Sequence, residues 1–106
     1  MEQTGCALKW ANGRLTVLVR GEVDHHSAKG LREEIDHAMY LYRPEILARD
    51  LSSVDFMDSS GLGLILGRYT KLQTLGGKLV ISKTTPAIRK LLQLAGADKL
   101  FPIEEK

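Results

Sequence analysis

The segment Met57–Gly67, MDSSGLGLILG, places two serines directly after an aspartate and directly before a strongly apolar run. A helix N-terminus presents unpaired N–H groups and a partial positive charge, so Ser59 or Asp58 could simply cap a helix that starts here. Alternatively, Ser59 is a phosphorylation site. A phosphate carries about −1.5 to −2 charge, which suits a helix N-terminus but penalises a partner packed on the same surface. The segment therefore predicts either a helix cap or a binding switch that leaves the fold intact.

The glycines of the same segment are unusual for a solvent-facing helix surface. At 100° per residue, one side of the expected helix carries an apolar stripe of Leu62, Ile65, Leu66, Tyr69, Leu72 and Leu75. The opposite side carries Ser60, Gly63, Gly67 and Lys71, with Leu64 among them. Each glycine costs roughly 0.5–1 kcal/mol relative to alanine. Two explanations are open: another protein's backbone approaches closely here, with Leu64 as an apolar contact, or the glycines relieve crowding inside the domain.

Catalytic and cofactor motifs fit the sequence poorly. Asp24, His25, His26 and Ser59 are the residue types of a serine hydrolase, but MDSSGLG lacks the G-x-S-x-G elbow. The glycines are spaced G-x-G-x-x-x-G rather than G-x-G-x-x-G, and a polar loop is expected before them, which argues against a dinucleotide site. The two adjacent histidines have no cluster of acidic or cysteine ligands nearby in sequence. We therefore expect no enzyme activity, no cofactor and no metal site.

Strands and helices are expected to alternate along the chain. Asn12-Gly13 separates two strand-like runs, and both residues tolerate the positive φ of a hairpin turn. Thr85, Pro86 and Gly96 have the positions of an N-cap, a first helical residue and a stop. We expect strands over 6–10, 14–20, 45–51, 78–82 and 99–103, a loop over 52–58, and helices over 26–42, 59–75 and 86–95.

This β-β-α-β-α-β-α-β order predicts an α/β domain with a small mixed sheet, parallel except for the opening hairpin. In such sheets, sites gather beyond the carboxyl ends of the strands. Asp24, Asp58 and Ser59 fall at that kind of position, each between an expected strand and an expected helix.

Composition places the chain among ordinary soluble domains. Its 106 residues form one expected domain, 1–106, with a net charge of +2, which is too small to indicate nucleic-acid binding. No apolar run approaches the roughly 18 residues of a membrane span, and the N-terminus lacks the apolar core of a secretory signal. Cys6 cannot form an internal disulfide, so we expect a buried or half-buried strand cysteine and a cytoplasmic location.

Two motifs together resemble a known family. GEVDHHSA over 21–28 and FMDSSGLGLILGRY over 56–69 are similar to the anti-sigma factor antagonists of the STAS-domain family, and GGKLVIS and PAIRKLL extend the similarity over nearly the whole chain. DSSGLG is common to the family. Its pairing with DHH and LGRY is typical of the sporulation branch, the antagonists that control the first forespore sigma factor.

The resemblance implies a fold, a switch and its residues. Helices would pack mainly on one face of the sheet. Ser59 would be phosphorylated by the anti-sigma factor, which in this family is also a serine kinase, and a dedicated serine phosphatase would reverse the modification. The unphosphorylated form would bind that kinase and release the sigma factor. The contact surface would hold Asp24 beside Ser59, with Asp58, Ser60, Gly61, Gly63, Leu64 and Gly67 on or near it. The alternatives are a nucleotide-binding or hydrolysing domain, and an antagonist in a general stress response.

Two features depart from the family's pattern. Arg49 stands in an expected strand where relatives usually have an aliphatic residue. A buried unpaired charge is costly, so we expect either an open sheet face there or pairing with an acid such as Asp50 or Asp55. Relatives usually also continue into a further C-terminal helix, which this sequence lacks after IEEK.

Overall fold

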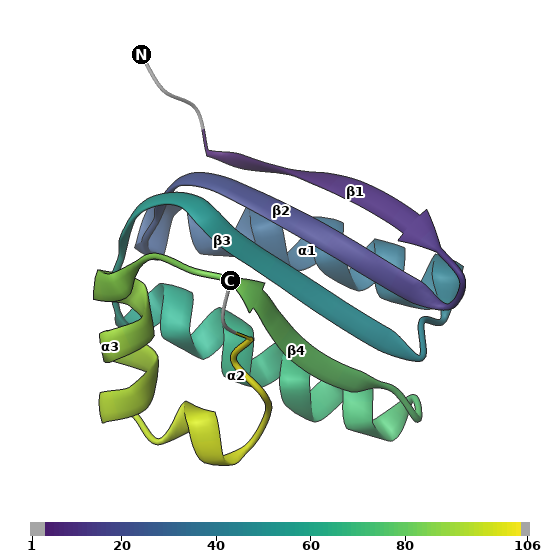
Figure 1. Cartoon of the computed structure of the whole chain (residues 1–106). Coiled ribbons are helices and arrows are strands. Elements are labelled where there is room, and N and C mark those ends of the chain that lie inside the picture. The colour runs from purple at the N-terminus through teal and green to yellow at the C-terminus, as the bar shows by residue number, and fades with distance from the viewer. Residues whose placement is uncertain (1–3, 105–106) are drawn as a thin grey trace.

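A computed structural model describes residues 4–104, and its elements follow the expected order as far as the third helix (Figure 1). They are β1 (Gly5–Ala11), β2 (Arg14–Val23), α1 (His25–Tyr42), β3 (Ile46–Met57), α2 (Ser59–Thr74), β4 (Lys78–Lys83), α3 (Pro86–Leu94) and the 3₁₀ turn η1 (Ala97–Lys99). The strands form one sheet in the order β1-β2-β3-β4. β1 is antiparallel to β2, and β2, β3 and β4 are parallel, which confirms the mixed sheet. None of the described helices is both long and apolar enough to cross a membrane.

The sheet has one covered and one open face. In β2, Leu15, Val17 and Val19 are fully buried, whereas the alternating Leu18 and Arg20 are exposed. The period of two in a strand sends these sets to opposite faces. The long helices α1 and α2 both lie behind the sheet in Figure 1, on the face that buries the valines. The expected packing of helices mainly on one face is therefore confirmed.

Local signals place the turns and the last helix correctly. Asn12 and Gly13 both have positive φ, 50° and 79°, as the hairpin requires. Thr85 caps α3 by accepting a hydrogen bond from the backbone N–H of Ile88 at 3.2 Å, and Pro86 is the first helical residue. Gly96 follows the helix at a φ of 78°. Each of these features depends on a few neighbouring residues, so the sequence is enough to predict them.

The expected loop over 52–58 is wrong, because β3 continues to Met57. Its polar second half pairs with β2, joining Arg20 to Ser53 and Val23 to Met57 in register. This pairing supplies backbone hydrogen bonds that the local composition does not reveal. β3 therefore runs directly into α2, and the absence of a strand-to-helix junction no longer argues against a dinucleotide site. The glycine spacing still does.

The expected last strand reduces to a single bridge between Ile103 and Ile81. The backbone N–H of Ile81 donates to the Pro102 carbonyl at 2.9 Å, and the N–H of Glu104 donates to the Ile81 carbonyl at 2.7 Å. Proline has no N–H to extend such a ladder. η1 also takes up residues 97–99, which shortens the extended segment.

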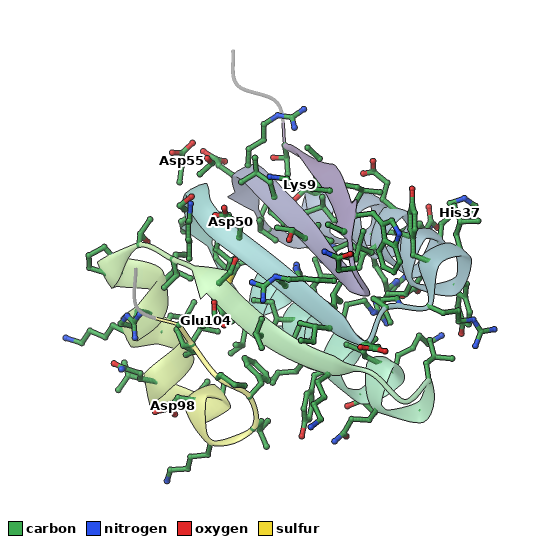
Figure 2. All side chains as sticks on the ribbon, turned by 45° about the vertical axis from the view of Figure 1, so that its right-hand side comes forward. Lys9, His37, Asp50, Asp55, Asp98 and Glu104 are labelled. Carbon is green, nitrogen blue, oxygen red and sulfur yellow. The ribbon has the colours of Figure 1, made fainter. Side chains whose placement is uncertain are left out.

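Both expectations for Arg49 are wrong. Arg49 lies on the covered face in register with Val17 and Ile81, and only 1% of its surface is exposed. Asp50 instead accepts hydrogen bonds from Ser52, at 3.0 Å from the backbone N–H and 2.6 Å from the hydroxyl. Figure 2 shows Asp55 projecting outward from the sheet, where it is exposed. Among the described residues, the Arg49 Nε and Nη1 atoms have no hydrogen-bond partner.

The surroundings of Arg49 do not neutralise its charge. Burial lowers its pKa to about 10, which still leaves the guanidinium charged at pH 7. The thiol of Cys6 is close enough to interact with it, but burial and the neighbouring Glu34 raise the pKa of that thiol to about 11. Cys6 is therefore neutral at pH 7. Within residues 4–104, the core consequently holds a cation that forms no ion pair.

Candidate functional site

Two aspartates follow one register pair at the edge of the sheet. Val23 of β2 pairs with Met57 of β3, and Asp24 and Asp58 come directly after them. The backbone N–H of Asp58 donates to the Val23 carbonyl at 3.2 Å, which ties the two chain segments together. α1 and α2 start from this point and run side by side (Figure 1). The structure thus brings together the neighbourhoods of Asp24 and Ser59, which are far apart in sequence.

Asp58 is the N-cap of α2. Its Oδ1 accepts hydrogen bonds from the backbone N–H groups of Ser60 at 2.8 Å and Gly61 at 3.3 Å. Ser59 is the first helical residue, is exposed, and makes no side-chain hydrogen bond within the described part of the chain. Of the two possible caps, the structure selects Asp58. The Ser59 hydroxyl therefore has no capping function and faces solvent at the positive end of a helix.

Asp24 caps α1 in the same way, as part of a capping box. Its Oδ1 accepts from the backbone N–H groups of His26 at 2.9 Å and Ser27 at 3.1 Å, while the Ser27 hydroxyl accepts from the Asp24 N–H at 3.1 Å. The hydrogen bond from the Ser27 N–H, followed by that from His26, holds the pKa of Asp24 below its usual value. Asp24 is therefore ionised at neutral pH. Its carboxylate caps α1 and also adds a negative charge to the surface.

Gly61 lies inside the domain and not on the contact surface suggested by the resemblance. It is buried, and a Cβ added there would come within 2.5 Å of Met57 Cγ and 3.0 Å of the Val23 carbonyl oxygen. The missing side chain lets α2 begin tightly against the β2–α1 junction. Crowding inside the domain, one of the two explanations for the glycines, therefore holds for Gly61.

Gly63 and Gly67 have the opposite environment. A Cβ added at either position would meet nothing within 4 Å, so these glycines relieve no crowding inside the domain. Both line a groove between α1 and α2, and Ser60 lies at the end of the groove where α2 begins. Leu64 fits the expected apolar contact only in part. It borders the groove, but it is only 6% exposed and belongs to the core. It therefore offers a partner little apolar surface.

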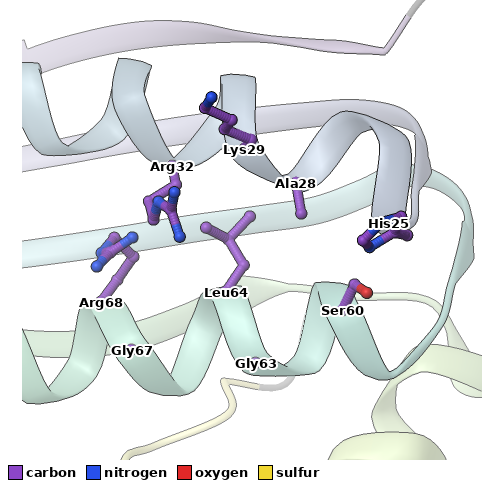
Figure 3. Close-up of a pocket in the computed structure, with 9 residues that line it drawn as sticks. All are labelled: His25, Ala28, Lys29, Arg32, Ser60, Gly63, Leu64, Gly67 and Arg68. Carbon is purple, nitrogen blue, oxygen red and sulfur yellow. The ribbon is translucent and has the colours of Figure 1, made fainter.

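The groove has a volume of about 380 Å³ and a basic lining that the sequence analysis missed (Figure 3). His25, Lys29 and Arg32 border it from α1, and Arg68 borders it from α2. A spacing of three and four residues puts the three α1 side chains on one helix face. This spacing was visible in the sequence, but only the packing shows that the face adjoins Gly63 and Gly67.

Arg68 is anchored at the floor of the groove. Its Nε lies 3.0 Å from Asp36 Oδ1 of α1, and its side chain is 8% exposed. Neither of these two atoms has a hydrogen-bond partner among the described residues, so the contact is an ion pair. The described residues 4–104 contain no group of three or more His, Cys, Asp or Glu side chains placed to hold a metal ion.

Comparison with known proteins assigns the family. The sequence profile of the STAS domain matches residues 7–106. The chain belongs to the STAS-domain family. The anti-sigma F factor antagonist of Paenibacillus polymyxa is 38% identical to this STAS domain, over 86% of this chain and 78% of the relative. The anti-sigma F factor antagonist of Lysinibacillus sphaericus is 36% identical, over 78% and 73%.

Solved structures share the fold of this STAS domain. An anti-sigma factor antagonist from Mycobacterium paratuberculosis superimposes with a TM-score of 0.87 at 31% identity, covering 98% of this chain and 87% of that one. The antagonist SpoIIAA in its unphosphorylated form gives a TM-score of 0.80 at 26% identity, covering 96% and 90%. The Bacillus cell fate determinant SpoIIAA has also been solved in a phosphorylated form, with a TM-score of 0.73, 26% identity and coverage of 96% and 93%.

Proposed function

We propose that this STAS domain is an anti-sigma factor antagonist controlled by phosphorylation of Ser59. Its unphosphorylated form binds an anti-sigma factor that is also a serine kinase, and binding releases the sigma factor. The kinase phosphorylates Ser59 and thereby ends the interaction, and a serine phosphatase restores it. The protein itself acts in the cytoplasm as a binding partner and not as a catalyst.

The position of Ser59 carries this proposal. Its hydroxyl is exposed at the first turn of α2, while Asp58 alone supplies the capping oxygen. An attacking hydroxyl must be reachable by the phosphoryl donor, and this one is not engaged by the domain. Gly63, one turn further along α2, is exposed and leaves open space for a protein backbone to approach.

A phosphate on Ser59 would be compatible with the fold. The first turn of α2 contains no acidic side chain, so a dianion there meets the unpaired N–H groups and positive end of the helix. On the surface, the same group adds about −1.5 to −2 charge beside the carboxylates of Asp24 and Asp58. Burying that charge under a partner costs desolvation and repulsion, so binding is lost while the domain stays folded.

The sporulation pathway is favoured over a general stress response by the relatives. Antagonists named for sigma F reach 38% and 36% identity, whereas an anti-sigma-B factor antagonist of Listeria monocytogenes reaches 28% over 85% of this chain and 78% of the relative. The kinase of a forespore-type partner switch is therefore the first partner to test.

Phosphorylation of the intact chain tests the proposal. The chain is incubated with Mg-ATP and the anti-sigma factor kinase encoded by the same genome, and the product is mapped by mass spectrometry. We expect one phosphate, on Ser59, and none on a Ser59→Ala variant. Ser60→Ala is the matched control and should be phosphorylated like the parent. A phosphate on Ser60, or none at all, would show that the site is wrongly assigned.

A further inference from the structure

The groove between α1 and α2 carries unbalanced positive charge. Lys29 and Arg32 are exposed on α1, and Arg68 faces them from α2. Figure 3 shows the Arg32 and Arg68 side chains reaching toward each other across the groove. Two guanidinium groups that converge in this way repel each other unless an anion lies between or beside them.

Nearby carboxylates balance only part of this charge, because the one ion pair of the groove within the described residues joins Arg68 to Asp36 and leaves Lys29 and Arg32 on the surface. α2 contains no Asp or Glu, and no carboxylate borders the groove among the residues the structure describes. Of the three acids of α1, Asp36 pairs with Arg68, Glu34 borders a separate hollow beside β1, and Glu33 is not among the groove-lining residues. The buried Arg49 adds a further positive charge close enough to Arg68 to interact with it.

The groove is also shaped for a polypeptide chain. Gly63 and Gly67 stand one turn apart along its α2 wall, and each leaves open space where a side chain would project. Ser60 lies at the end nearest Ser59, with His25 opposite it (Figure 3). A segment that lies in the groove would therefore continue directly from the phosphorylation site.

We propose that this groove docks an acidic segment of the kinase, whose carboxylates pair with the exposed Lys29 and Arg32. The inference rests on the proposed function and adds the chemistry of the contact. Charge complementarity of this kind raises the association rate and selects among partners, because a kinase that presents basic residues here would be repelled. Ser59 phosphorylation then switches the interaction, while the groove determines which kinase is recognised.

Charge reversal in the intact chain tests the docking. Both Lys29→Glu and Arg32→Glu change exposed residues, so the fold should remain and circular dichroism should be unchanged. We expect the double variant to bind the kinase about tenfold more weakly than the parent and to lose most of the salt dependence of binding. Lys9→Glu, on the edge strand β1 (Figure 2), is the matched control and should bind like the parent.

Zero-length crosslinking provides a direct readout. A carbodiimide joins an amine to a carboxylate in contact, and we expect it to link Lys29 to an Asp or Glu of the bound kinase. If the double variant binds as tightly as the parent while Ser59 is still phosphorylated, the docking inference is wrong and the proposed function stands. If the kinase neither binds nor phosphorylates the parent, both fail. If calorimetry shows that ATP alone binds the isolated chain and that Arg32→Glu abolishes this binding, the groove holds a nucleotide and the docking inference is wrong.

Discussion

Asp24 and Asp58 are equivalent N-caps of two helices that leave the same edge of the sheet. Each follows one member of the register pair Val23–Met57, and the hydrogen bond from the Asp58 N–H to the Val23 carbonyl fixes their relation. Each carboxylate accepts two backbone N–H groups of its own helix. The edge therefore combines two helix N-termini, two carboxylates and the exposed hydroxyl of Ser59.

Substitution of Ser59 should separate binding from folding. Ser59→Asp adds a permanent negative charge at the helix start, and we expect it to fold normally but bind the kinase about 5- to 150-fold more weakly. Ser59→Ala should bind like the parent and resist phosphorylation. Calorimetric titration with the kinase, together with thermal unfolding of each variant, checks both statements. A Ser59→Asp protein that binds as tightly as the parent contradicts the switch.

Removal of the α2 cap should cost stability where removal of the Ser59 hydroxyl does not. Asp58→Ala leaves the N–H groups of Ser60 and Gly61 without their acceptor, so we expect the free energy of unfolding to fall by about 1 kcal/mol. Asp58→Asn keeps a capping oxygen and should stay close to the parent. Urea denaturation of these two variants and Ser59→Ala is the measurement. A large loss for Ser59→Ala would mean that Ser59 also supports the helix.

The three glycines of α2 should respond differently to alanine. In Gly61→Ala the new methyl group collides with Met57 and Val23, and we expect a loss of about 1–3 kcal/mol in unfolding free energy. Gly63→Ala and Gly67→Ala point into open space and should each gain about 0.5–1 kcal/mol through helix propensity. The same two variants should weaken kinase binding, because their methyl groups occupy the groove. Equal stability changes at all three positions would contradict the packing described.

Replacement of Arg49 by an apolar residue should stabilise the domain. Arg49→Met keeps the volume and removes a buried charge without a counter-ion, so we expect a gain of about 1–4 kcal/mol at pH 7. Arg68→Met is the informative comparison, because it strips Asp36 of its ion-pair partner and should destabilise the domain. Chemical denaturation of both variants measures these changes in unfolding free energy. A destabilised Arg49→Met would indicate that the guanidinium has a stabilising partner.

The Asp24 cap should make stability fall in acid. The pKa of Asp24 is lower in the folded chain than its ordinary value of 3.8, chiefly through the Ser27 N–H. The unfolded chain therefore takes up this proton first as pH drops, so the contribution is complete above pH 3.8 and is lost as pH falls through the folded pKa. The unfolding free energy of Asp24→Asn, measured from pH 6 down to pH 2, should decline less steeply than that of the parent. Parallel curves would show that Asp24 is not the responsible group.

Local sequence signals predicted much of the fold, whereas features that depend on packing between distant segments were not predicted. Thr85, Pro86 and the Asn12-Gly13 turn act through adjacent residues, and the structure confirms them. The second half of β3 is a strand only because β2 lies beside it. The helical wheel of α2 sets Leu64 opposite the apolar stripe, whereas the structure buries Leu64 and Arg68, so the buried arc is rotated from the one that the wheel indicates.

The candidate site shows the same division. The sequence pointed to Asp58 and Ser59, but only the structure decides which of them caps the helix. The buried arc of α2 is centred on Ile65 and includes Leu64 and Arg68, while Tyr69 packs toward Phe101 with ring centroids 5.4 Å apart. The basic groove was not predicted from the sequence, because its lining residues come from two helices and no single sequence segment contains them all.

The division of roles between Asp58 and Ser59 has a consequence for the lifetime of the protein in the cell. Because one residue holds the helix and its neighbour remains chemically free, a group attached to that neighbour leaves the unfolding equilibrium almost untouched. Proteases that degrade transiently opened chains would then remove both covalent forms at the same rate. Among chains that are not bound to the kinase, the ratio of the two forms would then report only the enzymes that add and remove the group.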